Sequence, residues 1–164
     1  MKLVILNGAS CSGKSTVIEN LMKQKERYFH LSYDALKWQF SQYASGKYYD
    51  DLHKLRLAIL RALCELKYNV ITEAVHKASR QKHIDIAIEY GYEIVEINLD
   101  TDYETLLKRR DERAAARNRK EDLSKERFDS LFNAYQSEKN DEAITFKTDA
   151  QSVEEITEGI LKLL

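Results

Sequence analysis

Residues 8–15 read GASCSGKS, and this stretch decides the fold because it matches the pattern G-x-x-x-x-G-K-[ST]. It follows the apolar run LVIL at residues 3–6 and precedes the helix-like segment TVIENLM at residues 16–22. A strand, a glycine-bounded loop and a helix in this order form the context in which the pattern binds phosphate groups. The sequence therefore predicts a binding site for a nucleoside triphosphate.

Each residue type in this loop suits a polyphosphate. Gly8 and Gly13 let the backbone turn sharply and approach the phosphates, and the amides between them can form an anion site at the positive end of the helix. Lys14 is expected to reach the β- and γ-phosphate oxygens and to be catalytic, while the Ser15 hydroxyl is expected to hold Mg²⁺. The predicted nucleotide contacts in this region are Gly8, Ser10, Cys11, Ser12, Gly13, Lys14, Ser15 and Thr16.

Composition indicates one domain over residues 1–164, since 43% apolar residues suffice for a single core. The 26 basic and 27 acidic residues give a net charge of −1, which argues against long nucleic acid and anionic membrane as partners. No apolar run approaches the roughly 20 residues needed to span a bilayer. We therefore expect a cytoplasmic protein with reduced cysteines, acting as a monomer or homodimer.

Strand-like and helix-like segments alternate along the chain, which predicts a parallel sheet with helices on both faces. The helix over 50–67 is expected to bury a stripe of leucine and isoleucine, and Gly91 is expected to end the next helix. Two later helices begin with capping boxes, Thr101 with Glu104 and Ser152 with Glu155. The predicted strands are 3–6, 28–32, 69–75, 92–99 and 143–147, and the predicted stripe is Leu52, Leu55, Ile59, Leu63 and Leu66.

The order of these parts resembles the P-loop kinases of small molecules and nucleotides, such as gluconate and shikimate kinases, polynucleotide kinase domains and chloramphenicol phosphotransferase. The resembling stretches are residues 4–15, 33–36, 70–73 and 146–149. The resemblance implies an α/β P-loop NTPase fold, a three-layer sandwich whose five-stranded parallel sheet has the order 2-3-1-4-5. It also implies ATP, Mg²⁺ and transfer of the γ-phosphoryl group to a hydroxyl or phosphate of a small molecule or nucleotide.

Two acidic residues stand at predicted strand ends, where open α/β sheets bind ligands. In the resembling kinases an aspartate at the position of Asp34 accepts the acceptor's proton or orders Mg²⁺, so Asp34 is predicted as a catalytic, substrate-binding and metal-binding residue. The alternative is that Asp34 caps the following helix. Glu73 resembles the acid that binds Mg²⁺ through water, and the alternative is an ordinary strand-end charge.

The densest positive cluster lies at residues 108–120 and resembles the mobile lid, about 108–122, that closes over the phosphates. Arg110, Arg113 and Arg117 share one helical face, where guanidinium groups can neutralise charge on the transferred phosphoryl group. Arg110 and Arg113 are predicted to be catalytic and Arg109 to bind the nucleotide. The alternative is a solvated helical face with acidic partners.

The segment of about 34–67 corresponds to the part in which the resembling kinases hold the phosphate acceptor. Lys37, Trp38 and Arg56 are predicted, with Asp34, to contact that acceptor. A polynucleotide 5′-hydroxyl is the alternative acceptor. A further alternative is a non-catalytic, GTPase-like switch, because FKTD at residues 146–149 is one residue from the guanine-reading pattern [NT]-K-x-D.

Overall fold

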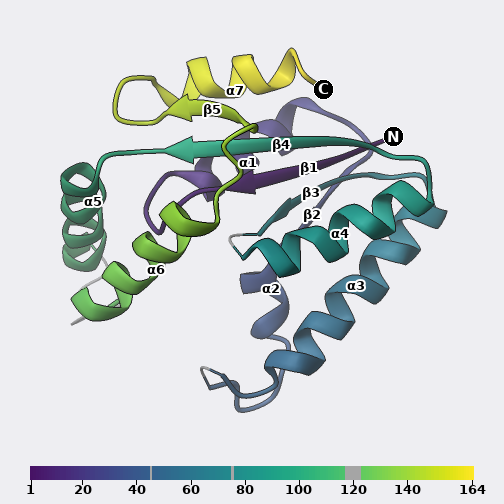
Figure 1. Cartoon of the computed structure of the whole chain (residues 1–164), viewed down its shortest axis with the longest axis horizontal. Coiled ribbons are helices and arrows are strands. Elements are labelled where there is room, and N and C mark those ends of the chain that lie inside the picture. The colour runs from purple at the N-terminus through teal and green to yellow at the C-terminus, as the bar shows by residue number, and fades with distance from the viewer. Residues whose placement is uncertain (45, 75, 117–122) are drawn as a thin grey trace.

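Five strands form one parallel sheet in the order β2-β3-β1-β4-β5 (Figure 1), seen in a computed structural model that describes residues 1–44, 46–74, 76–116 and 123–164. This confirms the predicted strand order and the P-loop NTPase fold. Strand order reverses beside β1, so the edge beyond its carboxyl end is the place where such sheets bind ligands. The strands are β1 Lys2–Asn7, β2 Tyr28–Leu31, β3 Asn69–Glu73, β4 Glu93–Asp100 and β5 Ile144–Lys147.

Helices cover both faces of the sheet. In Figure 1, α3 and α4 lie on one face and α1 and α7 on the other, while α5 and α6 lie beyond the carboxyl end of β4. Within the described ranges, none of the helices is long and apolar enough to cross a membrane. The helices are α1 Lys14–Gln24, α2 Tyr33–Lys37, α3 Tyr49–Glu65, α4 Lys77–Glu89, α5 Tyr103–Ala116, α6 Lys125–Glu138 and α7 Val153–Leu161.

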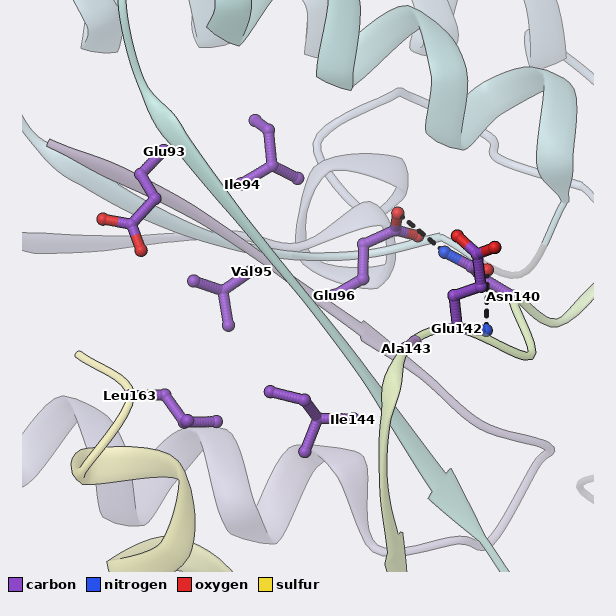
Figure 2. A pocket seen from close by; sticks show the side chains of 9 residues that line it. All are labelled: Glu93, Ile94, Val95, Glu96, Asn140, Glu142, Ala143, Ile144 and Leu163. Atoms are coloured by element: carbon purple, nitrogen blue, oxygen red, sulfur yellow. Dashed lines mark hydrogen bonds between the residues drawn. The ribbon is translucent and has the colours of Figure 1, made fainter.

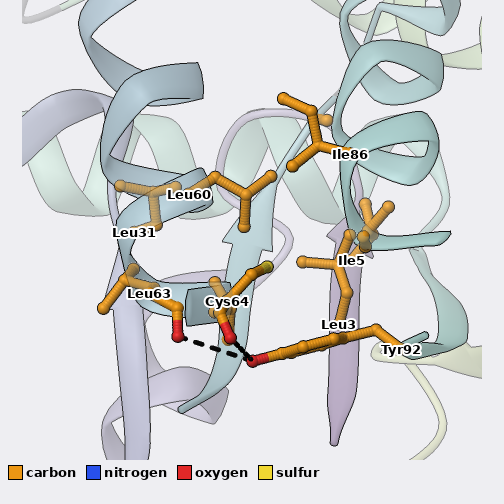
Figure 3. Packing of buried hydrophobic residues seen from close by; sticks show 11 residues of the cluster. Leu3, Ile5, Leu31, Leu60, Leu63, Cys64, Ile86 and Tyr92 are labelled. Atoms are coloured by element: carbon orange, nitrogen blue, oxygen red, sulfur yellow. Dashed lines mark hydrogen bonds between the residues drawn. The ribbon is translucent and has the colours of Figure 1, made fainter. Parts of the chain in front are cut away.

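Strand β1 is apolar at every central position because helices cover it on both sides. Successive side chains of a strand point to opposite faces, so Leu3 and Ile5 pack toward α3 and α4, while Val4 and Leu6 pack toward α1 and α7. All four are fully buried. Figure 3 shows the cluster on the side of α3 and α4, which includes Tyr92. The Tyr92 hydroxyl donates to the Tyr68 carbonyl at 2.7 Å. This packing fixes the strand that leads into the phosphate-binding loop.

A third, smaller cluster holds α5 and α6 against that loop. Leu106 of α5, with Phe128 and Tyr135 of α6, is buried and packs around Ala9. The Tyr103 ring extends the cluster, with its centroid 5.7 Å from that of Phe128. The arginine-rich helix α5 is therefore anchored beside the loop that its side chains were predicted to serve.

The predicted buried stripe of α3 was partly wrong. Leu52 and Leu63 are buried, but Leu55 and Leu66 are 39% and 62% exposed. An arginine lies on the buried face because it finds hydrogen-bond acceptors on β3, and a pattern of apolar residues alone gives no sign of such partners. The buried residues of α3 are Leu52, Arg56, Leu60, Leu63 and Cys64.

Helix ends follow local chemistry, with one correction. The Ser152 capping box is confirmed, and Gly91 has the expected positive φ of 72°. The box predicted at Thr101 is wrong, because Asp102 Oδ1 accepts the hydrogen bond from the Thr105 amide at 2.8 Å. The buried Thr101 hydroxyl instead lies 2.6 Å from the hydroxyl of Thr148. This is because β4 runs on to Asp100, so that Thr101 directly follows the strand.

Candidate active site

The main cleft of the described residues opens at the carboxyl end of the sheet and has a volume of about 1240 Å³. Its walls come from the loop before α1, from α2, α3 and β3, and from α5, α6 and the start of α7. A smaller hollow of about 360 Å³ lies over β4 beside Ile144 and Leu163 (Figure 2) and contains none of the predicted site residues.

The loop at residues 8–15 has the backbone geometry that a phosphate site needs. Gly13 has φ of 88° and Cys11 φ of 68°. A Cβ on Gly8 would lie 2.9 Å from the Leu99 carbonyl oxygen, so only glycine fits against β4. Gly13 is the N-cap of α1 without any side-chain cap, which leaves the first amides of the helix open toward the cleft. These features fit a bound triphosphate.

Lys14 is already held over this loop. Its Nζ donates to the carbonyl oxygens of Gly8 at 2.8 Å and Ala9 at 2.9 Å. Desolvation lowers the pKa of Lys14, and the negative charge of Glu73 is the largest opposing influence. All the predicted contacts of the loop except Gly8 line the main cleft, namely Ser10, Cys11, Ser12, Gly13, Lys14, Ser15 and Thr16.

Asp34 lines the cleft from the first turn of α2, and its side chain is 75% exposed. Lys37 Nζ lies 2.5 Å from Asp34 Oδ1, one turn later on the same helix, so these two predicted residues are brought together. Asp34 is not the helix cap, because Ser32 Oγ accepts from the Ala35 amide at 3.2 Å. This excludes the alternative in which Asp34 serves only as the cap.

Arg56 and Glu73 meet at the floor of the cleft. Arg56 is 2% exposed, and its Nη2 donates to Thr72 Oγ1 at 2.9 Å and to the Glu73 carbonyl at 3.0 Å. Burial lowers the pKa of Arg56, an effect that Glu73 opposes, yet a guanidinium stays protonated in proteins. The Glu73 carboxylate lies 3.7 Å from His30 Nε2. Both residues line the cleft facing the loop that carries Lys14.

The arginines of α5 occupy the other side of the cleft. Arg109 donates to Thr148 Oγ1 at 2.8 Å and to the Thr148 carbonyl at 2.6 Å, which connects α5 to the loop before α7. Arg110 donates from Nε to the Leu123 carbonyl at 2.9 Å, and Arg113 is exposed and also lines the cleft. Residues 117–122 of the predicted lid, including Arg117, lie outside the described residues.

Aromatic residues line the part of the cleft where the acceptor was predicted to bind, but Trp38, which the sequence singled out, is not one of them. Trp38 is 67% exposed, packs edge-on against Tyr43 and is not among the residues that line the cleft. Tyr33 and His53 do line it, with ring centroids 5.9 Å apart. Sequence reasoning did not assign either to the site, although Tyr33 directly precedes Asp34 and His53 lies one helical turn before Arg56.

The lysine and the aspartate of the guanine-like pattern lie outside the lining of the main cleft. Lys147 Nζ lies 2.5 Å from Asp100 Oδ2 at the end of β4, and neither Lys147 nor Asp149 lines the main cleft. Across the described ranges, no group of three or more His, Cys, Asp or Glu side chains could hold a metal ion. A magnesium ion here would therefore depend on Ser15, on one or two of the predicted acids and on phosphate oxygens, as this ion commonly does.

The fold and this cleft define a P-loop kinase-like protein. The profile of the family named AAA domain matches residues 3–137, so the chain belongs to that family. A search of curated proteins finds no significant match.

Solved structures with the same fold include several kinases. A chain of the Pnkp1/Rnl/Hen1 RNA repair complex superposes with a TM-score of 0.71 and 27% identity over 83% of this chain, which spans 44% of that longer chain. The APS kinase CysC of Mycobacterium tuberculosis, in complex with AMPPNP and APS, superposes with a TM-score of 0.64 and 20% sequence identity. The match covers 99% of this chain and 96% of the CysC chain. Shikimate kinase from Aquifex aeolicus superposes with a TM-score of 0.60 and 20% sequence identity, over 98% of this chain and 94% of the shikimate kinase chain.

Proposed function

We propose that this protein is an ATP-dependent kinase that transfers the γ-phosphoryl group to a hydroxyl or phosphate group of a small molecule or nucleotide. The observation that carries the proposal is that Lys14, Asp34 and Arg56, from three separate elements, line one cleft. A protein that only binds nucleotide needs the phosphate loop, whereas a kinase also needs a place for the acceptor and a group to take its proton.

In this reaction the bond between the γ-phosphorus and the β,γ-bridging oxygen breaks, and a bond from the acceptor oxygen to the γ-phosphorus forms. Lys14 and the open amides of α1 bind the phosphate oxygens. Asp34 receives the proton that leaves the acceptor hydroxyl. Ser15, together with Asp34 or Glu73, would hold Mg²⁺, which would supply positive charge to the phosphates.

Helix α5 is the described part of the proposed lid. Arg110 and Arg113 would neutralise the charge that spreads over the transferred phosphoryl oxygens. Arg109 and the loop at Thr148 would lie against the nucleotide, since both line the cleft next to Gln151 and Val153. Closure of this helix over the phosphates would exclude water from the reacting group.

A polynucleotide 5′-hydroxyl is a second candidate acceptor, supported by the 27% identity to a chain of an RNA repair complex. The net charge of −1 favours a small acceptor instead. A guanine-specific switch has less support, because Lys147 is paired with Asp100. Calorimetry with ATP and with GTP distinguishes the guanine-specific switch from the kinase. A clear preference for GTP would contradict the kinase proposal.

The test uses Asp34→Asn in a phosphorylation assay against hydroxyl-bearing metabolites, nucleosides and 5′-hydroxyl oligonucleotides. Because Ser32 caps α2, the change leaves the cap in place and the melting temperature should hardly move. ATP affinity should stay within a few-fold, while transfer should fall roughly 10²–10⁴-fold, as for a lost general base. Asp51→Asn, an acid in the first turn of α3, is the matched control and should match the wild type. Full transfer activity in Asp34→Asn would remove Asp34 from the mechanism.

A further inference from the structure

Arg56 is a buried cation without an anionic partner in contact. It is 2% exposed, and its guanidinium makes no ion pair within 4.0 Å with any carboxylate of the described residues. Its two hydrogen-bond acceptors, Thr72 Oγ1 and the Glu73 carbonyl, are both neutral. The Nε atom is buried and has no hydrogen-bond partner in the same part of the chain. Part of the donor fork of Arg56 is therefore unused.

Such an arrangement is unfavourable for folding by itself. Removing an ion from water costs several kcal/mol after relaxation, and neutral acceptors offset only part of that. The neighbouring buried positions of the same helix face, Leu52, Leu60 and Leu63, are apolar and carry no such cost. A packing role alone would be served by another apolar residue, so the charge at this position calls for an anion from outside the chain.

The two histidines near Arg56 are neutral near physiological pH. Burial, with the charge of Arg56 as the next cause, lowers the pKa of His53 and of His83, so neither imidazole competes with Arg56 for an anion as a second cation. Among carboxylates, the charge of Glu73 has the largest influence on the pKa of Arg56, and Glu73 lies 3.7 Å from His30. An anion entering this part of the cleft would therefore meet the Arg56 guanidinium as its positive partner, near two neutral histidines.

The position of the guanidinium is also fixed in advance. It lies over the Tyr33 ring, with Cζ 5.5 Å from the ring centroid, and both residues line the cleft. A planar guanidinium held in one orientation suits an oxyanion, because carboxylate and phosphate oxygens match its fork of donors. Tyr33 directly precedes Asp34 in α2, so the guanidinium lies on the side of the cleft that carries the proposed base.

We propose, on the basis of the kinase function proposed above, that the acceptor carries an oxyanion in addition to the hydroxyl that is phosphorylated, and that Arg56 binds this oxyanion. A phosphate and a carboxylate share the required chemistry. Neutral sugars, alcohols and unphosphorylated nucleosides are then poor acceptors.

The first measurement concerns binding and does not need a reaction. Wild-type protein, saturated with AMPPNP and Mg²⁺ to fill the phosphate loop, is titrated with inorganic phosphate and separately with acetate at constant ionic strength. The melting temperature should rise with at least one of these anions. Arg56→Gln should weaken that binding roughly 10- to 100-fold, the range for a lost charged hydrogen bond. Arg61→Gln, on the exposed face of the same helix, is the control and should bind as the wild type does.

The second measurement compares acceptors in matched pairs, a nucleoside with its 3′-monophosphate and a sugar with its sugar acid. Wild-type kcat/KM should favour the anionic member by roughly 10- to 100-fold, and the better pair identifies phosphate or carboxylate. Arg56→Gln should lose this preference, whereas Arg56→Lys should keep part of it. If neither variant folds, the wild-type preference alone decides the proposal.

The two proposals fail in different ways. Anion binding through Arg56 without transfer to any acceptor would leave the anion site standing and overturn the kinase function. Equal use of neutral and anionic acceptors, with no stabilisation by phosphate or acetate, would overturn the anion site and leave the kinase function standing. Equal losses for both members of each pair in Arg56→Gln would show that Arg56 only supports the fold.

Discussion

The two halves of the main cleft are built in different ways. The phosphate half is centred on one continuous stretch, residues 10–17, which presents mostly backbone groups and one lysine, and α5 adds arginines to the cleft wall. The acceptor half is assembled from α2, α3 and β3, and presents a carboxylate, a buried guanidinium and aromatic rings. Backbone amides at a helix start have the same chemistry in any sequence, so the first half is fixed by glycine positions. The second half depends on which side chains packing brings together.

The difference extends to the cost of each half. Open amides at the start of α1 remain near solvent in the cleft and carry little penalty before the ligand binds. A guanidinium that is 2% exposed carries a desolvation cost in the free protein. We therefore expect substitutions in the phosphate half to change activity with little effect on folding, and substitution of the buried Arg56 in the acceptor half to change both.

Lys14→Ala gives the largest expected effect. The side chain contacts only loop carbonyls in the free protein, so the melting temperature should change little. Turnover should fall roughly 10³-fold or more, comparable to loss of another cation that contacts the transferred phosphoryl group. Steady-state kinetics and thermal melting on the same samples measure both. Lys23→Ala, in the last turn of α1, is the matched control. Unchanged turnover in Lys14→Ala would rule out this loop as the catalytic phosphate site.

His83→Asn tests the buried neutral histidine behind the acceptor half. Burial and the nearby Arg56 lower the pKa of His83 to about 4, whereas an unfolded histidine titrates near 6.5. The unfolded state therefore binds more protons between these values. This contribution to stability is complete above pH 6.5 and is lost as the pH falls toward 4.

Between pH 7 and 5 the loss due to His83 should be about 2 kcal/mol, measured by urea unfolding. Asparagine keeps a donor for the Ser79 carbonyl, which His83 Nδ1 contacts at 2.7 Å, but does not titrate. The variant should therefore show a shallower pH dependence by about this amount. An identical decline in both proteins would show that His83 is not held neutral.

Ser32→Ala gives the smallest expected effect and is directed at the helix that carries Asp34. Loss of this cap should cost about 1 kcal/mol and raise the KM of the acceptor a few-fold. Ser152→Ala removes the cap of α7 at the other end of the cleft and should lower stability by a similar amount. Any kinetic change in that variant should concern ATP and not the acceptor. Equal effects of both variants on acceptor KM would contradict the separation of the two halves.

Local sequence was enough wherever neighbours along the chain decide the structure. The phosphate loop, the positive φ of Gly91 and the Ser152 capping box each depend on a few consecutive residues, and all were predicted correctly. The strand order was predicted from a resemblance, and the alternation of strands and helices agreed with it. Boundaries moved by a residue or two, as at β4, which extends to Asp100 and takes Thr101 out of the helix cap.

Residues whose partners are distant in the sequence were predicted less well. Lys147 could be read as part of a guanine site until the sheet placed it beside Asp100, 47 residues away. Trp38 was predicted to contact the acceptor, although the rings that line the cleft include Tyr33, Tyr43 and Tyr49 and not Trp38. Residue type and spacing do not reveal which of several neighbouring rings will face inward.

The sequence by itself determined that this chain folds around a phosphate-binding loop, because two glycines, a lysine and a helix start act through their own backbone and immediate neighbours. Only the tertiary structure decided that Arg56 belongs to the buried face of α3. Its position there depends on Thr72 and Glu73, which lie 16 and 17 residues away and reach it only when β3 joins the sheet. A charged residue is buried where distant partners hold it, and those partners come together only when the sheet and α3 pack.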